Sequence, residues 1–360
     1  MGNGDKYESS QKNRLIMKSR RIFLIFALLT APILFSCSQP PQKNLWFMMD
    51  TIVEITLFAN KNAEISTAEM FDKIQNFLQN WDERFSPSAE NSEISKINNR
   101  ESDTVNISDD LYEMLKISIF YSQKTDGFFD VTVKPLKDFW NIAGAGDFLP
   151  DPKDSSIADT LAQILQAVDY RGISLIESPK RAVFENPNAE IDLGAIAKGF
   201  VIDRLADILK NYGFSNFIIN IGGDIFVSGN KERGKPIVVG VRHPRQRDDL
   251  LKVFSVGGEN RQSAAIFTSG DYERFRIAPS GARVHHIFDP KTGFPVTANI
   301  SLTIIGDCAI AADILSTAFF SLSADEIRKK IKKFDGYGFI LVDKDGEVGE
   351  KEIMCNTVKL

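Results

Sequence analysis

The chain has 360 residues, of which 43% are hydrophobic and 25% are charged, and its formal net charge is −5. Those values are typical of globular proteins and exclude collagen-like, disordered and polytopic membrane classes. Residues 1–36 carry six basic and two acidic groups, so the rest of the chain holds 37 basic against 46 acidic residues. An acidic body lacks the basic surface that binding to a phosphate backbone needs, and we expect no nucleic-acid partner.

The N-terminus has the pattern of a targeting segment. Residues 22–35 form an unbroken, mostly apolar run that follows Lys18, Arg20 and Arg21. This run is too short to span a bilayer but suits the central part of a secretory signal. We therefore expect a signal peptide over residues 1–36, with Met17 as an alternative start.

The end of that run, Leu34-Phe35-Ser36-Cys37, resembles a bacterial lipobox. We expect Cys37 to be lipidated and residues 37–44 to form a tether, which would anchor the protein on the periplasmic side of the inner membrane. An ordinary cleaved signal peptide with an incidental cysteine is the alternative.

The first half of the body interleaves strand and helix patterns. Period-two alternation predicts a strand over residues 48–58, and helical spacing of apolar residues predicts a helix over 67–85. Ser108 followed by two aspartates predicts the cap of a second helix that runs to about Thr125. After a loop over 144–156, residues 173–176 and 182–184 predict a pair of strands.

The second half is denser. A strand into Asp192 and a glycine-rich turn precede a helix over 197–212. Further strands are predicted over 217–221, 237–241, 264–268, 274–278, 284–288 and 339–342, and further helices over 309–321 and 325–334. This mixed order favours an α+β fold, with mixed or antiparallel sheets and packed helices, and residues 45–360 are expected to form one domain.

Several common site types are absent from the sequence. The chain has no GxxxxGK[ST] or CxxC motif and no complete GxGxxG motif, and it has only three histidines. A zinc site of the His/Cys type would use nearly all of them, so a hard metal bound by oxygen ligands is more plausible.

Four segments could carry chemistry. Residues 192–199 place glycines where a strand leads into a helix, and the N-terminus of a helix favours anions. Residues 220–224 and 285–295 could be sites or plain turns. On the apolar segment 312–317, Asp313 and Thr317 share one helix face, and metal ligation would compensate the burial of this carboxylate. A helix cap is the competing interpretation.

Together with residues 47–51, 85–94, 127–132 and 268–272, these segments resemble the ApbE family of FAD:protein FMN transferases, over about residues 46–340. The resemblance implies a T-fold-like architecture and a Mg²⁺-dependent enzyme. Such an enzyme splits FAD, attaches FMN through a phosphodiester to a Thr or Ser of an acceptor protein, and releases AMP. It further suggests acceptors among membrane redox subunits of the sodium-pumping quinone reductase (Nqr) or Rnf type.

The resemblance also implies site residues. Mg²⁺ would be held by the carbonyl oxygen of Ala195 and the side chains of Asp313 and Thr317. The residues implied to contact FAD are Met49, Phe128, Phe129, Asp130, Asp192, Lys198, Asp271, His286 and Ile287. By type and position, His286 is the best candidate for the base that accepts the hydroxyl proton. The sequence departs from the family at Asp50, where a glycine is usual, and near Ser88, where a common aromatic is missing.

Two alternatives stay open. Water could replace the acceptor, which would make the protein an FAD pyrophosphatase that yields FMN and AMP. A non-catalytic flavin-binding lipoprotein is the second alternative, and the intact pair of Asp313 and Thr317 argues against it because passive binding needs no metal at the scissile bond.

Overall fold

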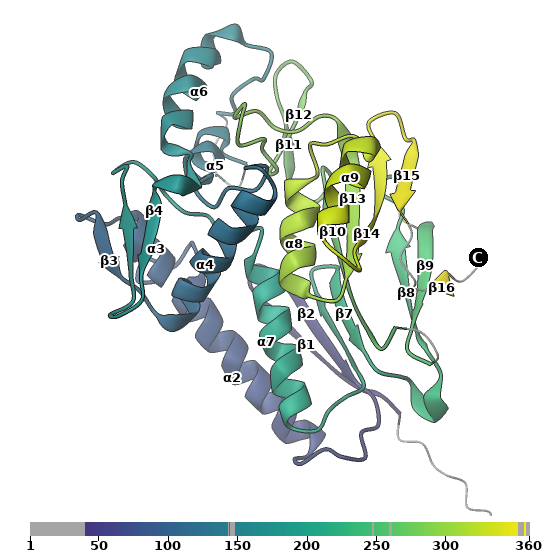
Figure 1. The fold of residues 1–360 in the computed structure, drawn as a ribbon. Coiled ribbons are helices and arrows are strands. Elements are labelled where there is room, and N and C mark those ends of the chain that lie inside the picture. The colour runs from purple at the N-terminus through teal and green to yellow at the C-terminus, as the bar shows by residue number, and fades with distance from the viewer. Residues whose placement is uncertain are drawn as a thin grey trace, which may run out of the picture. The chain divides into compact units, whose positions relative to one another are not determined.

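An eight-stranded, entirely antiparallel sheet organises the computed structural model (Figure 1). The structure describes residues 40–142, 144, 148–246, 248–258, 261–351 and 356–357. In spatial order the strands are β1 (Gln42–Met48), β2 (Thr51–Leu57), β6 (Phe217–Ile221), β7 (Asp224–Ser228), β10 (Ser263–Gly270), β13 (Asn299–Gly306), β14 (Gly338–Asp343) and β15 (Val348–Lys351).

The remaining described strands form three smaller sheets. Their orders are β16 (Asn356–Thr357), β9 (Leu250–Val256), β8 (Ile237–Arg242); then β3 (Thr104–Asn106), β5 (Arg181–Phe184), β4 (Ile173–Ile176); and the pair β11 (Phe275–Ile277), β12 (Arg283–His285).

Four of the described helices, α2, α3, α4 and α9, begin at a serine cap. Ser66 and Glu69 form a capping box at the start of α2, and the Ser108 hydroxyl accepts the Leu111 N–H at the start of α4. The helices are α2 (Thr67–Phe85), α3 (Glu93–Asn98), α4 (Asp109–Lys124), α5 (Lys134–Trp140), α6 (Ala158–Ile164), α7 (Ala197–Asn211), α8 (Ala309–Ala318) and α9 (Ala324–Lys330). No helix in the described part of the chain is long and apolar enough to cross a membrane.

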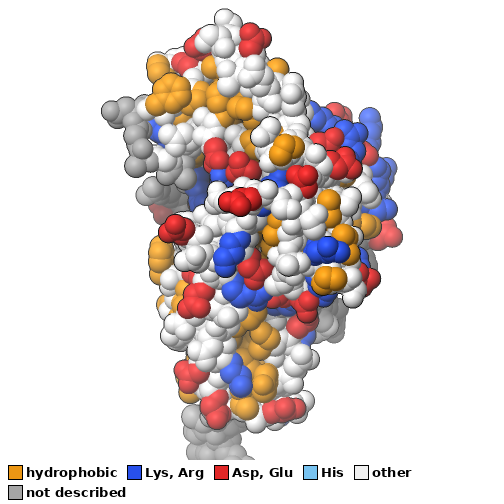
Figure 2. Space-filling view, turned by 90° about the vertical axis from the view of Figure 1, so that its left-hand side faces the viewer, with side chains coloured by type: hydrophobic (Ala, Val, Ile, Leu, Met, Phe, Trp, Pro, Cys, Tyr) orange, Lys and Arg blue, Asp and Glu red, His pale blue; other side chains and the backbone are white. Residues whose placement is uncertain are grey.

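The middle strands of the large sheet are buried on both faces, and β10 shows how. Ala265 and Phe267 belong to the core formed with the helices, among them α7 and α8. The alternate residues Ala264 and Ile266 belong to a second core formed with β8 and β9. Acidic and basic side chains are interspersed over the molecular face shown in Figure 2.

The α+β class is confirmed, as are the helix over 67–85 and the cap at Ser108. Several expected elements differ from the structure in their bounds. The strand expected over 48–58 is two strands, because Met49 and Asp50 form a turn. The first of these strands starts at Gln42, so residues 42–44 of the expected tether belong to the sheet. Residues 37–39, including Cys37, lie outside the described residues.

The strand expected to lead into Asp192 is also wrong. Only an isolated bridge joins Val133 and Glu190 there. The backbone N–H of Ile191 donates to the Asn98 side chain, and that of Asp192 donates to the Val131 carbonyl, so these groups are satisfied without a strand partner.

Other elements end earlier than the pattern suggests. The helix expected over 309–321 ends at Ala318, and the one over 325–334 ends at Lys330 before a short 3₁₀ turn. The strand expected over 284–288 ends at His285.

Candidate active site

The first turns of α7 and α8 pack directly against each other at Gly199. A Cβ at this position would lie 2.6 Å from the Ala309 carbonyl oxygen and 2.7 Å from the Ile310 Cα, so only glycine permits the approach. Asp203 of α7 accepts the N–H groups of Ala309 and Ile310, both at 3.0 Å. In return, Asp313 of α8 accepts the N–H of Gly199 at 2.8 Å. Each helix therefore caps the other.

This cross-capping changes the hydrogen bonding before α7. In a regular helix the Gly199 N–H would donate to the carbonyl of Ala195, four residues earlier. Because Asp313 takes that N–H, the Ala195 carbonyl lies outside the helical pattern. With one carboxylate oxygen, Asp313 caps a helix, which is the neighbouring helix α7 and not its own. Both interpretations of this residue, as a helix cap and as a metal ligand, are therefore relevant.

The Asp313 carboxyl group lacks full charge compensation. Its side chain is 4% exposed. Burial raises its pKa to about 7, because the attraction of Lys198 and the Gly199 hydrogen bond offset the desolvation and the nearby Asp224 charge only in part. Thr317 lies one turn further along α8, with its hydroxyl 3.3 Å from the Ser269 hydroxyl. A cation would relieve this carboxylate.

Lys198, which is half-buried, forms an ion pair with the buried Asp224 beside Asp313. Asp224 is 3% exposed, and its second oxygen accepts the Thr268 N–H at 2.9 Å. Burial disfavours the charged ammonium of Lys198, but Asp224 and Asp313 outweigh it and raise the pKa of this lysine. Lys198 therefore remains positively charged.

A second group surrounds His286. The His286 Nδ1 lies 3.2 Å from the carbonyl oxygen of Arg274. Because a carbonyl can only accept, Nδ1 carries the hydrogen and Nε2 keeps a lone pair. Burial, and after it the charges of His285, Arg274 and Lys137, lowers the pKa of His286 to about 4 and outweighs the hydrogen bond to the Arg274 carbonyl. The imidazole is therefore neutral at physiological pH.

The neighbouring His285 has a different role. It is buried, its Nε2 donates to the Val296 carbonyl at 2.5 Å, and its Nδ1 accepts the Ile287 N–H at 3.2 Å. Both ring nitrogens are occupied, so His285 fixes the segment while His286 keeps a free nitrogen. Ile287 is buried in the core and could meet a ligand only through its backbone.

Two expected contact residues are held by basic partners. The Asp192 carboxylate lies 2.5 Å from the Lys137 ammonium and accepts the Gly194 N–H at 2.8 Å. Burial opposes ionisation of Asp192, but Lys137 outweighs it and lowers the pKa. Asp271 makes two hydrogen bonds to Arg245, at 2.8 and 2.6 Å. No sequence pattern marked Lys137 or Arg245, which lie far from these aspartates in the chain.

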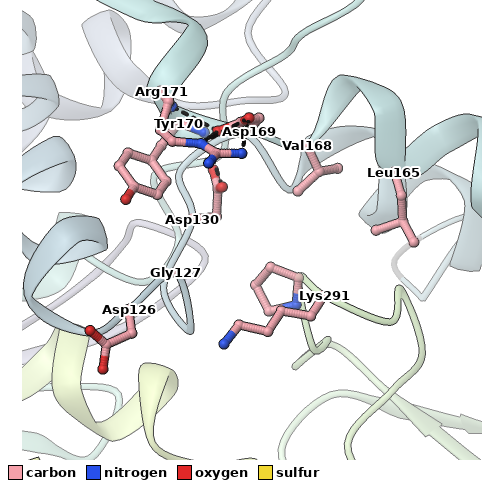
Figure 3. A pocket seen from close by; sticks show the side chains of 10 residues that line it. Asp126, Gly127, Asp130, Leu165, Val168, Asp169, Tyr170, Arg171 and Lys291 are labelled. Carbon is pink, nitrogen blue, oxygen red and sulfur yellow. Dashed lines mark hydrogen bonds and ion pairs between the residues drawn. The ribbon is translucent and has the colours of Figure 1, made fainter.

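Of the segment 128–130, Asp130 lines a cavity of about 360 Å³, shown in Figure 3. Asp130 is buried, and its oxygens accept the N–H and hydroxyl of Thr132 and the N–H of Tyr170. Burial raises its pKa despite these bonds. Phe129 belongs to the core, whereas Phe128 is half-buried with the Lys291 ammonium 3.6 Å from its ring centre.

Met49 belongs to a turn at the end of two strands of the large sheet. It lies in the turn between β1 and β2, next to the turn between β6 and β7 that precedes Asp224. The Gly222 N–H donates to the Ile52 carbonyl at 3.0 Å and joins these two turns. The structure thus gathers Ala195, Lys198, Asp224, Asp313 and Thr317 around α7 and α8.

The donor set suits a hard cation. Among the described residues, no three or more His, Cys, Asp and Glu side chains form a group that could hold a metal ion. The candidate ligands are the Ala195 carbonyl, the Thr317 hydroxyl and the Asp313 carboxylate. They form the all-oxygen, low-charge set that Mg²⁺ uses together with phosphate oxygens. The residues present therefore fit Mg²⁺.

Comparisons of the whole chain with known proteins give one consistent family. The ApbE family model matches residues 49–341. The FAD:protein FMN transferase of Treponema pallidum is 28% identical over 320 residues, covering 84% of each chain. That of Haemophilus influenzae is 27% identical over 304 residues, covering 82% of this chain and 85% of the relative. A crystal structure of the ApbE protein of Thermotoga maritima superposes with a TM-score of 0.77 at 30% identity, covering 87% of this chain and 97% of that one.

Proposed function

The chain belongs to the ApbE family, and from this premise we propose that it is a Mg²⁺-dependent FAD:protein FMN transferase. In the proposed reaction the hydroxyl oxygen of an acceptor Thr or Ser bonds to the FMN phosphorus. The phosphoanhydride bond of FAD breaks, and AMP leaves with the electron pair of that bond. The product is FMN joined to the acceptor by a phosphodiester.

The observation that carries this proposal is the buried, under-compensated carboxylate of Asp313, which takes the Gly199 N–H that a regular helix would give to the Ala195 carbonyl. Ala195, Asp313 and Thr317 would hold the cation. When bound, Mg²⁺ neutralises charge on the pyrophosphate oxygens and so favours attack at phosphorus. Lys198 adds a second positive charge, and Asp224 fixes the direction in which its ammonium points.

His286 would accept the hydroxyl proton at Nε2. The hydrogen bond from Nδ1 to the Arg274 carbonyl orients the ring, and the lowered pKa keeps it in the neutral form that can act as a base. The FAD molecule would contact the side chains of Met49 and Phe128 and the backbone of Phe129 and Ile287.

Three of the proposed FAD contacts are aspartates, namely Asp130, Asp192 and Asp271. Their side chains would bind FAD in positions that neighbouring residues already fix. Lys137 fixes Asp192, Arg245 fixes Asp271, and the Thr132 and Tyr170 backbone groups fix Asp130. Preorganised polar groups of this kind bind a ligand without reordering when it arrives.

Anchoring through Cys37 is part of the same proposal. A lipid on this residue would hold the enzyme at the periplasmic side of the inner membrane, near acceptors such as Nqr- or Rnf-type redox subunits. Cys37→Ala should release the protein from the membrane fraction without altering turnover on a soluble acceptor. Retention of the variant in carbonate-washed membranes would contradict lipidation at this residue.

The function is tested by incubating the purified protein with FAD and Mg²⁺, with and without an acceptor protein. Transfer predicts AMP release only when the acceptor is present, together with flavin that stays on the denatured acceptor. AMP release without acceptor would instead indicate a pyrophosphatase, and no AMP in either case would indicate a binding protein.

A further inference from the structure

The turn between β1 and β2 has an unusual backbone. Met48 pairs with Thr51, so Met49 and Asp50 alone form the turn. Both residues are left-handed, with φ of 57° and 55°. This is the geometry of a type I′ hairpin turn, in which Asn and Gly are favoured and a long side chain such as that of methionine is strained. Such strain persists only where the surroundings hold it.

One carboxylate provides that hold from the helix side. The Met49 N–H donates to both oxygens of Asp82, at 3.0 and 3.1 Å. Within the described part of the chain, no basic side chain pairs with Asp82, so its charge is directed at this single N–H. A hydrogen bond to an ionised acceptor is stronger than one between neutral groups.

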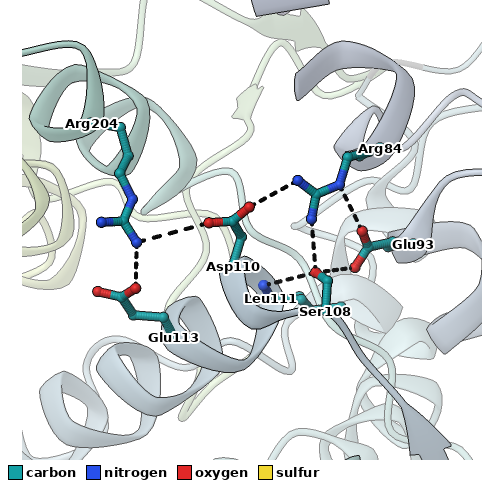
Figure 4. Close-up of polar contacts among 7 residues, drawn as sticks. All are labelled: Arg84, Glu93, Ser108, Asp110, Leu111, Glu113 and Arg204. Atoms are coloured by element: carbon teal, nitrogen blue, oxygen red, sulfur yellow. Dashed lines mark hydrogen bonds and ion pairs between the residues drawn. The ribbon is translucent and has the colours of Figure 1, made fainter. Parts of the chain in front are cut away.

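The helix that carries Asp82 is itself anchored. Asp82 lies in the last part of α2, and the Arg84 guanidinium just after it bonds to Glu93 at 2.9 Å, Asp110 at 2.8 Å and Ser108 at 2.9 Å (Figure 4). Earlier in α2, Gln75 accepts the indole N–H of Trp46 at 3.2 Å. The end of α2 is therefore a fixed base for the turn.

The sheet side of the turn is equally constrained. Gly222 has a φ of 63°, and a Cβ there would lie 2.6 Å from the Thr51 hydroxyl oxygen. Thr51 thus occupies space that only a glycine leaves free. The turn is held between this glycine and Asp82, and Met49 is at its tip.

We propose that Asp82 is a positioning residue for the flavin substrate, which holds Met49 in the left-handed conformation that directs it at FAD. Asp82 acts through the Met49 backbone and does not touch FAD. This inference rests on the proposed function, because Met49 is a proposed FAD contact. It assigns a role in substrate affinity to a residue outside the site described above.

The test is FAD binding to the full-length protein, followed by flavin fluorescence without Mg²⁺ so that no turnover occurs. Asp82→Ala should raise the Kd for FAD about tenfold, the effect of losing a hydrogen bond to a charged acceptor when it acts fully on binding. With Mg²⁺ and acceptor present, KM for FAD should rise while kcat changes little. Asp82→Asn keeps one acceptor oxygen and should give a smaller rise.

Two further variants separate positioning from a general structural role. Glu83→Ala removes the exposed neighbouring acid on α2 and should leave the Kd unchanged. Asp50→Gly makes the left-handed turn easier to form, so Asp82→Ala should raise the Kd less in that background.

An unchanged Kd in Asp82→Ala, or an equal rise in the wild-type and Asp50→Gly backgrounds, would overturn the inference. If Asp82→Ala does not fold, Asp82→Asn decides by the same measurement. If the wild-type protein binds FAD but transfers no flavin, the proposed function fails while the Kd values still decide the role of Asp82. No FAD binding by the wild type would overturn both.

Discussion

The crossing of α7 and α8 and the turn between β1 and β2 serve one candidate site in different ways. At the crossing, the carboxyl groups of Asp224 and Asp313 are buried, and both depend on Lys198 for charge compensation. At the turn, the constrained feature is the backbone of Met49 and Asp50, held by the single carboxylate of Asp82.

Because of this difference, substitutions in the two regions should affect different properties of the protein. Removing one member of a buried charge cluster leaves the others unpaired, which affects both stability and catalysis. Releasing a strained turn lowers its order and affects substrate affinity. We therefore expect large changes in rate and stability from the crossing, and small ones from the turn.

The largest effect is expected from Asp313→Ala, which removes the only charged ligand proposed for Mg²⁺. Loss of about 4 kcal/mol of transition-state stabilisation corresponds to about a thousandfold lower transfer rate. Titration of activity with Mg²⁺ measures this. Asp335→Ala, which removes an exposed acid elsewhere, is the matched control and should behave as the wild type. An unchanged metal requirement in Asp313→Ala would falsify the site assignment.

Lys198→Met should destabilise the fold by about 3–5 kcal/mol, because it leaves two carboxylates buried without their cation. The free energy of unfolding in urea measures this change. Lys43→Met is the control, since its pair with Glu54 is exposed to solvent and should contribute at most about 1 kcal/mol. Equal losses in the two variants would remove the distinction between buried and exposed pairs.

His286→Ala should lower kcat about 10²–10⁴-fold while FAD affinity changes little. Because the pKa of His286 is lowered, its base form is present above about pH 4, so the wild-type rate should rise with pH through that value and be constant at neutral pH. Flavin-transfer assays stopped at fixed times across this pH range give the dependence of the rate on pH. A rise centred at about pH 6.5, the ordinary value for histidine, would contradict the lowered pKa. Near-normal transfer in the variant, or a parallel loss of FAD binding, would show that His286 is not this base.

The smallest effect is expected from Asp50→Gly at the turn. Glycine adopts a left-handed φ without the steric cost of a side chain, so the variant should be more stable by up to about 1 kcal/mol. Urea unfolding measures this, and a loss of stability would mean that the Asp50 side chain contributes more than its backbone costs.

The crossing of α7 and α8 could be predicted from the sequence better than the turn between β1 and β2. Asp313 was recognisable because a carboxylate in an apolar helix has to be compensated. The glycines of residues 192–199 indicated a close approach to a ligand, whereas Gly199 packs against α8. Asp50 was visible only as a departure from glycine, and the strained turn was hidden inside an apparently continuous strand. Lys137, Asp82 and Arg245 carried no signal, because their importance comes from partners distant in the chain.

The fold shows the same limit. Helix α2, which has a polar cap and one apolar face, was predicted to the residue, whereas the strands β7 and β13 were missed. Strand β13 is buried along nearly its whole length, so the alternation that reveals a half-exposed strand is absent from its sequence. The strand expected before Asp192 failed because side-chain and loop groups satisfy that backbone.

The most direct test of the account measures metal binding itself. Mn²⁺, used in place of Mg²⁺, is titrated by electron paramagnetic resonance into the wild-type protein with FAD and into Asp313→Asn, which keeps an acceptor for the Gly199 N–H. We predict one Mn²⁺ site in the wild type, with an affinity at least about tenfold lower in the variant. Equal affinity in the two proteins would contradict a metal site at the crossing of α7 and α8.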